Sequence, residues 1–187
     1  MAILYRFWYS IAMTYYDDIY EFAVDNHYLI TTEDAGELGI PTIELAKLAY
    51  RGKLENIAWG LYRLTRYIPS DIDPYAQAVA RVGKDAYLYG ESVIAMLGLA
   101  PTNPEKIYVA ATARIRRKLP EAIIVVNRKQ GDEVTVYDGV RSQRINEAIV
   151  AAKETVMPER LLSALQRAEE EGYMTLAEIK RAKAALL

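Results

Sequence analysis

Residues 31–66, TTEDAGELGIPTIELAKLAYRGKLENIAWGLYRLTR, decide the fold of the first part of the chain. The leading threonine pair offers helix N-caps, and the acidic side chains that follow it favour the first turn of a helix. Gly39 ends this short helix, and Pro41 stands near the start of a second one, which an Arg-Gly pair stops. Residues 54–56 and 60–64 predict two short strands around a turn. Two helices joined by a tight turn and followed by a hairpin are typical of a winged helix-turn-helix, the alternative being a generic small α+β unit.

A longer helix is expected immediately before this stretch, over residues 14–26. Thr14, with Asp17 three residues later, has the pattern of a capping box, and apolar side chains recur after it at helical spacing. Residues 27–30 are expected to form a short extended segment. The sequence therefore predicts a first domain over residues 14–68.

Residues 1–13, MAILYRFWYSIAM, are expected to be an N-terminal extension. We expect them to come from a misassigned upstream start codon or a tag, and the alternative is an arm that packs on the first domain. The run is too short to span a bilayer and has no small-residue cleavage site, so we expect neither a signal peptide nor a membrane partner. Without an export signal or cysteine, the expected compartment is the cytoplasm.

A second domain is expected over residues 69–187, after a polar stretch bracketed by prolines that is typical of a domain boundary. Thr175 and Glu178 have the pattern of a capping box before a last helix. Helices are expected over residues 75–82, 91–97, 145–153, 158–171 and after Thr175, and strands over residues 106–111, 122–127 and 133–137. The whole chain is therefore predicted to be α+β, a winged helix-turn-helix followed by a small mixed sheet with C-terminal helices.

The composition excludes several kinds of chemistry. The 187 residues include no cysteine and one histidine, His27, which excludes a disulfide framework, a thiol nucleophile and a histidine-rich metal site. There is no P-loop and no glycine-rich dinucleotide motif. The strand that would supply the acid-x-Lys pair of a metal-dependent nuclease ends Asn127-Arg128-Lys129, with an asparagine where the carboxylate is needed. We expect no enzymatic activity, no cofactor and no metal.

The charge is divided unevenly along the chain. Residues 1–67 carry six lysines and arginines against nine acids, whereas residues 68–187 carry seventeen against sixteen, and the net charge is −2. An acidic first half argues against tight non-specific binding to DNA, which needs several cations at phosphates. Residues 45–66, however, hold five cations against one acid, which predicts a local basic strip on the third helix and the wing.

A helical wheel of the third helix separates a core side from an outward side. Leu45, Leu48, Ala49 and Gly52 fall on the core side, and the opposite side, flanked by Ala46, would enter a major groove. Its cations and threonine can bind phosphate or base edges, and its isoleucine can touch a thymine methyl group. The expected DNA-binding residues are Thr42, Ile43, Lys47, Tyr50, Arg51, Lys53, Arg63 and Arg66. For the isoleucine and tyrosine, the alternative is packing against the second domain.

The second domain has a basic cluster of its own. Its members are Arg114, Arg116, Arg117 and Lys118 in one loop, and Arg128 and Lys129 at the end of the next strand. If the two strands are neighbours, these side chains form one positive face that suits nucleic acid or an acidic partner. The alternative is an ordinary solvated loop.

The stretch over residues 29–127 resembles the AbiEi family of antitoxins. The second half of the resemblance lies in the segment ESVIAMLGL at residues 91–99, followed by Pro104 and the strand IYV at residues 107–109. The first half lies in Ile30-Thr31-Thr32, Gly39-Ile40, Leu45, Leu48, Arg51-Gly52-Lys53-Leu54 and Gly60-Leu61-Tyr62-Arg63.

The resemblance implies the antitoxin of a type IV toxin–antitoxin system linked to abortive infection and phage defence. It implies a winged helix that binds double-stranded DNA at inverted repeats in its own promoter and acts as a transcriptional autorepressor. It also implies a C-terminal domain that antagonises a co-encoded nucleotidyltransferase-like toxin, with neutralisation that need not involve a stable complex. The alternative is a winged-helix protein-interaction module that has lost DNA binding, favoured by the acidic first half and by Trp59 at the wing tip.

Overall fold

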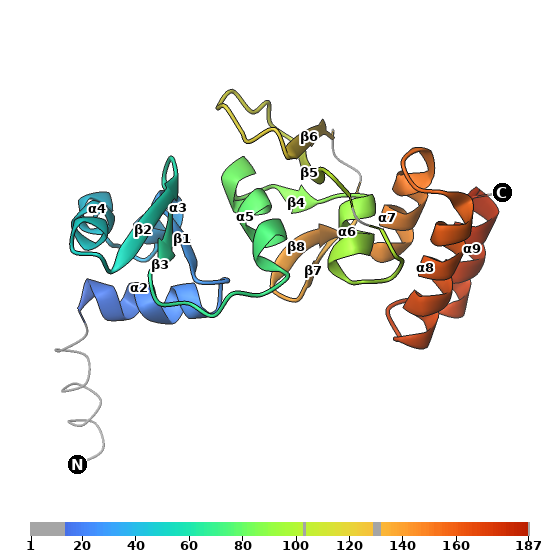
Figure 1. Ribbon diagram of the computed structural model, residues 1–187, viewed down its shortest axis with the longest axis horizontal. Helices are drawn as coiled ribbons and strands as arrows, with labels where there is room; N and C mark the ends of the chain where they lie inside the picture. The colour runs from blue at the N-terminus through green and yellow to red at the C-terminus, as the bar shows by residue number, and fades with distance from the viewer. Residues whose placement is uncertain (1–13, 103, 129–131, 187) are drawn as a thin grey trace, which may run out of the picture. The chain divides into compact units, whose positions relative to one another are not determined.

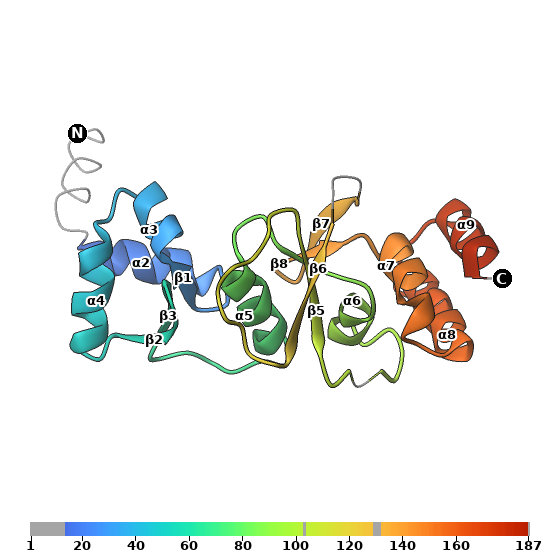
Figure 2. The ribbon, with the colours of Figure 1, turned by 90° about the horizontal axis from the view of Figure 1, so that it is seen from above.

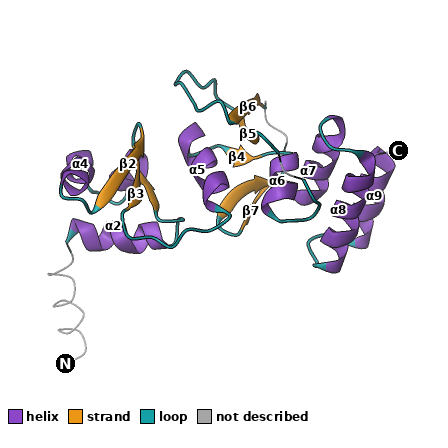
Figure 3. Cartoon of the chain, viewed as in Figure 1, coloured by secondary structure: helices purple, strands orange, loops and turns teal. Residues whose placement is uncertain are grey.

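The computed structural model describes residues 14–102, 104–128 and 132–186, so the expected extension over residues 1–13 lies outside the described residues (Figure 1). The chain forms two compact units that divide between Ser70 and Asp71. This division falls two residues after the boundary expected from the sequence. Each unit is α+β and has its own sheet (Figure 3).

The first unit contains three helices and three strands among its described residues. The sheet is antiparallel with the strand order β1-β3-β2, and the hairpin of β2 and β3 follows the helix pair of α3 and α4 (Figures 1 and 2). This arrangement fits a winged helix-turn-helix, as the sequence predicts. The elements are α2 (Tyr15–Val24), β1 (Leu29–Thr31), α3 (Thr32–Glu37), α4 (Thr42–Tyr50), β2 (Leu54–Ala58) and β3 (Leu61–Leu64).

Capping boxes fix the starts of the first two helices. At α2, the backbone N–H of Thr14 donates to Asp17 at 2.8 Å. At α3, the N–H of Thr31 donates to the Asp34 carboxylate at 2.8 Å, and the N–H of Asp34 donates back to the Thr31 hydroxyl at 3.0 Å. Each box satisfies backbone N–H groups that the first turn of a helix leaves without a partner.

Replacing Thr31 with alanine is expected to lower the free energy of unfolding of the first unit by about 1 kcal/mol, because the cap hydroxyl is lost. Urea denaturation followed by far-UV circular dichroism measures the change. Thr31→Ser keeps the hydroxyl and is the control. Equal stabilities for the alanine and serine proteins would show that the hydroxyl contributes nothing.

The structure corrects two local expectations in the first unit. Residues 27 and 28 are not extended: His27 and Tyr28 have φ values of 54° and 60° and form a turn, because the chain must reverse from α2 into β1. Gly52 is exposed rather than buried, and its φ of 71° lets it end α4. Pro41 is the residue immediately before α4, near the start of the helix as expected.

The core of the first unit lies between the helices and one face of the sheet. Leu45 and Leu48 of α4 pack in it with Ile30 of β1 and Leu64 of β3, and all four side chains are buried. The predicted core side of α4 is therefore correct for both leucines. Burying this side leaves the opposite side of α4 exposed.

The second unit contains a five-stranded mixed sheet of order β6-β5-β4-β8-β7. Strand pairs β5–β6 and β4–β8 are parallel, and pairs β4–β5 and β7–β8 are antiparallel. Its elements are α5 (Asp73–Val82), β4 (Tyr87–Leu88), α6 (Glu91–Met96), β5 (Ile107–Ala111), β6 (Ile123–Asn127), β7 (Val134–Tyr137), β8 (Val140–Gln143), α7 (Ile145–Ala151), η1 (Ala152–Glu154), α8 (Pro158–Glu170) and α9 (Leu176–Leu186).

Two strands of this sheet, β4 and β8, were not predicted from the sequence. Strand β4 has only two residues, and β8, with the sequence VRSQ, contains a single apolar residue, so neither shows an alternation of apolar and polar side chains. Both lie inside the sheet, where Leu88 pairs with Ser142. The structure also places Pro74 in the first turn of α5 rather than in a linker.

Candidate nucleic-acid interface

One side of α4 is exposed and carries the side chains expected to meet DNA. Ile43 is 58% exposed and Tyr50 is 95% exposed, and Thr42, Lys47 and Arg51 are also exposed. They lie together because the opposite side of the helix is buried in the core. The structure therefore brings five of the eight expected residues onto one continuous helical surface.

The cations of this surface differ in their surroundings. The Lys47 ammonium lies 2.7 Å from the Glu44 carboxylate, one turn earlier, so its charge is partly compensated. Arg51, at the C-terminus of α4, forms no ion pair with any described residue, and the same holds for the exposed Arg66 after the wing. The arginines are thus the cations whose charge is least compensated.

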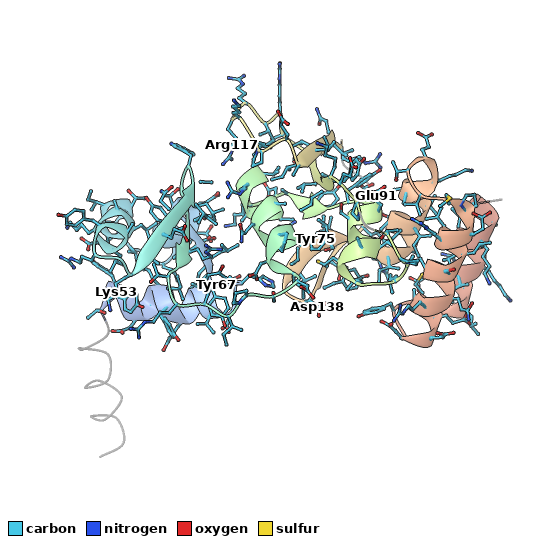
Figure 4. The ribbon with its side chains drawn as sticks, in the orientation of Figure 1. Lys53, Tyr67, Tyr75, Glu91, Arg117 and Asp138 are labelled. Atoms are coloured by element: carbon cyan, nitrogen blue, oxygen red, sulfur yellow. The ribbon has the colours of Figure 1, made fainter. Side chains whose placement is uncertain are left out.

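Lys53 and Arg63 are engaged within the first unit. Lys53 stands between α4 and β2 (Figure 4). Its ammonium group lies 5.5 Å from the centre of the Tyr16 ring. The Arg63 guanidinium contacts Glu55 at 2.6 Å and lies 4.2 Å from the centre of the Tyr67 ring. The Arg63 side chain is only 18% exposed, so the structure does not place it among the exposed cations.

The wing is fixed to the start of α3 by a close backbone contact. The N–H of Thr32 donates to the carbonyl of Gly60 at 2.9 Å. A Cβ atom at Gly60 would lie 2.9 Å from the Thr32 hydroxyl oxygen, so only glycine fits this position without a shift. Beside it, Trp59 at the wing tip is 84% exposed. The tryptophan stands out in the sequence, but no sequence pattern indicates the contact between Gly60 and Thr32.

The acidic residues of the first two helices are partly used in folding. Hydrogen bonds from the backbone and the side chain of Thr14 hold the pKa of Asp17 below its ordinary value. The Asp34 carboxylate accepts hydrogen bonds from the backbone N–H and the hydroxyl of Thr31 at the start of α3. These carboxylates lie at the starts of α2 and α3 and stabilise those helices. The net negative charge of the first half of the chain therefore does not show that the exposed side of α4 is negative.

The basic loop of the second unit begins at the sheet edge where β6 ends. Strands β5 and β6 are parallel neighbours with Ala111 opposite Asn127, so the loop and Arg128 start at the same edge, as the sequence analysis requires. Arg114, Arg116, Arg117 and Lys118 are exposed. Figure 4 shows Arg117 on this loop, where its guanidinium donates to the carbonyl of Val82 at 3.3 Å. Lys129 lies outside the described residues.

The loop arginines border a small open cavity of about 230 Å³. Ala113, Ile115, Leu119 and Val125 supply its apolar wall, and Arg114 and Arg117 supply its charge. The cavity therefore joins residues of the basic loop to Val125 and Asn127 of β6.

Arg128 differs from the loop cations because a buried carboxylate pairs with it. Its guanidinium donates twice to Asp132, at 2.5 and 3.0 Å, and the Tyr87 hydroxyl donates to the same carboxylate at 2.6 Å. Burial, together with this carboxylate, raises the pKa of Tyr87. Arg128 also lies 5.6 Å from the centre of the Tyr89 ring. The structure therefore assigns Arg128 to an internal network, beside an open cavity of about 500 Å³.

The order of helices and strands in the first unit, with one side of α4 exposed, fits a winged helix-turn-helix. Residues 17–65 match the family described as transcriptional regulator, AbiEi antitoxin. The matched segment covers most of α2 and everything from β1 to β3, and the second unit lies outside it. A search of curated proteins finds no match. None of the helices in the described residues is both long enough and apolar enough to cross a membrane.

Proposed function

We propose that this protein is an antitoxin that binds the promoter of its own operon and represses it. The exposed side of α4, presented next to the wing in a unit that matches a family of transcriptional regulators, is the observation that carries the proposal. Helices in this position of a helix-turn-helix lie in the major groove, with their N-terminal residues at base edges. The protein acts in the cytoplasm on double-stranded DNA, and inverted repeats are the proposed operator.

The charges of the first unit favour specific over non-specific binding. Arg51 and Arg66 are available for phosphates, whereas Lys47 is paired with Glu44 and Arg63 with Glu55. Few available cations give a weak sequence-independent contribution to affinity, because that contribution grows with the number of phosphates neutralised. The surface therefore suits a regulator that binds one operator and largely ignores other DNA.

The second unit is proposed to antagonise a co-encoded nucleotidyltransferase-like toxin of a type IV system. Its support is the sequence resemblance of residues 91–109 together with the basic loop that holds Arg114 and Arg116. A basic surface suits an acidic partner or the nucleic acid on which such a toxin would act. Growth of cells that express the toxin, with and without residues 71–187, tests this role directly.

Arg51→Ala is expected to weaken operator binding severalfold and to reduce the slope of log affinity against log salt by about one unit, because one phosphate contact is lost. Lys47→Ala is expected to act in the same direction with a smaller effect, since Glu44 already compensates its charge. Fluorescence anisotropy with the duplex upstream of the gene, at two salt concentrations and against a scrambled duplex, measures both changes.

Lys183→Ala, an exposed cation of α9 in the second unit, is the matched control. Circular dichroism spectra establish that all the variants are folded. Operator affinity equal to wild type in both α4 variants would rule out this DNA face.

The second candidate function is a protein-interaction module with a winged-helix fold. The exposed aromatic side chains at Trp59 and Tyr50 favour it, since large aromatic residues anchor protein interfaces. It predicts equal and weak binding to the operator and the scrambled duplex, and capture of a protein partner that Trp59→Ala abolishes. Tight, sequence-dependent DNA binding without such a partner would exclude it.

A further inference from the structure

The outward stripe of α4 has an unusual chemical character for a DNA-reading surface. Ile43, Lys47 and Tyr50 are four and three residues apart and fall within about 60° of one another around the helix. Ala46, also exposed, lies beside them. Two of these four side chains are purely aliphatic, so much of the stripe can neither donate nor accept a hydrogen bond.

Ile43 occupies the position of this stripe that is best placed to reach a base. It is the second residue of α4, and the N-terminal residues of a reading helix contact base edges. It remains 58% exposed although Leu45, two residues later, is completely buried. If Ile43 covers an apolar group of the DNA, its exposed apolar surface is removed from water, and this burial favours binding.

The major groove offers one apolar group to such a side chain. Guanine, cytosine and adenine present hydrogen-bonding atoms there, and thymine adds a 5-methyl group to its carbonyl. Burying Ile43 against a polar base edge would leave that edge without a partner, at a cost in affinity. Covering a thymine methyl group has no such cost and removes apolar surface of both partners from water.

The lysine of the stripe contributes little to base recognition compared with Ile43. Lysine reads guanine through its O6 and N7 atoms, but the Lys47 ammonium is held 2.7 Å from Glu44. A bond to guanine would have to replace or share that ion pair. The aliphatic contact at the start of the helix is therefore the stronger source of discrimination.

We propose that Ile43, flanked by Ala46, is a specificity-determining residue that recognises thymine 5-methyl groups in the operator. The proposal rests on the proposed DNA-binding function and names the chemical group that this surface reads. It implies that the operator half-site contains thymine where the N-terminal turn of α4 meets the groove.

Replacing thymine with uracil removes the methyl group and leaves the base pairing unchanged, so it tests the proposal on the full-length protein. The probes are two duplexes of the region upstream of the gene, one made with dTTP and one with dUTP, and the readout is fluorescence anisotropy. Wild type is expected to bind the uracil duplex at least fourfold more weakly, about the value of one buried methyl group. Ile43→Ala is expected to bind both duplexes within twofold of each other.

Leu38→Ala, which shortens another exposed aliphatic side chain of the first unit, is the matched control and is expected to keep the full thymine preference. Specific operator binding by wild type without a preference for thymine would overturn the inference and leave the proposed function standing. An equal preference in wild type and Ile43→Ala would also overturn it, because the methyl group would then act elsewhere or through DNA shape. Equal, weak binding to operator and scrambled duplexes would overturn the proposed function, and this inference with it.

Discussion

Leu45→Ala is expected to lower the free energy of unfolding of the first unit by about 3 kcal/mol and to abolish operator binding at the same time. Leu45 has no exposed surface and packs in the core cluster with Ile30 and Leu64. Truncation removes apolar contacts and leaves a cavity that the surrounding helices and sheet fill only in part. The effect on DNA follows because the same packing holds the exposed side of α4 in place.

Hydrogen–deuterium exchange of the peptides that cover α4, combined with urea denaturation, measures this loss in the first unit alone. Leu38→Ala removes the same atoms from a side chain that is 43% exposed, so it is expected to change stability by less than about 0.5 kcal/mol. Equal losses in the two variants would contradict the assignment of Leu45 to the core.

The second large effect is expected at Asp132. Asp132→Ala should destabilise the second unit by about 2 kcal/mol, because it leaves the buried Tyr87 hydroxyl without its acceptor and removes the ion pair of Arg128, whose side chain is 41% exposed. Hydrogen–deuterium exchange of the peptides that contain β4 and β8 reports this loss. Glu105→Ala, at an exposed acid that pairs with no described residue, is the control. Protection equal to wild type in the Asp132 variant would show that the network adds no stability.

The same carboxylate predicts a pH dependence with a definite sign. Burial opposes the charge of Asp132, but the hydrogen bonds from Arg128 and Tyr87 outweigh burial and hold its pKa below the ordinary value. A carboxyl group whose folded pKa is lowered contributes stability above its unfolded pKa, which is about 3.9, and loses it as the pH falls further. The stability difference between wild type and Asp132→Asn is therefore expected to be largest near pH 7 and to shrink below about pH 4. A difference that grows with acidity would contradict this.

The sequence alone was sufficient for features that depend on neighbouring residues. The capping boxes at Thr14 and Thr175 and the N-cap at Thr31 were predicted and are present, because each joins residues that are three apart in the chain. The order of helices and strands around α4 and the wing was predicted for the same reason. Helical periodicity also separated the buried Leu45 from the exposed Ile43.

The part of the candidate site on α4 was predictable from the sequence, but the part on the wing depends on contacts between residues that are distant in the chain. The wheel of α4 placed Lys47 and Tyr50 on the exposed side, but it gave no information on the wing. Arg63 was expected to contact DNA, and in the structure it faces Glu55 on the neighbouring strand, eight residues away in the chain. That pairing depends on the register of the β2–β3 hairpin, which contains a bulge between Asn56 and Ala58.

The sequence by itself predicted a helix pair and a hairpin that fit a winged helix-turn-helix, with Ile43, Lys47 and Tyr50 on the outward side of α4, because turns, caps and periodicity act within a few residues. Only the tertiary structure decided which strands meet and which charges neutralise one another. Arg128 and Asp132 are four residues apart, yet their network is completed by Tyr87, which is forty-five residues from Asp132. Such partners depend on a sheet order that brings distant strands together, and no local pattern encodes it.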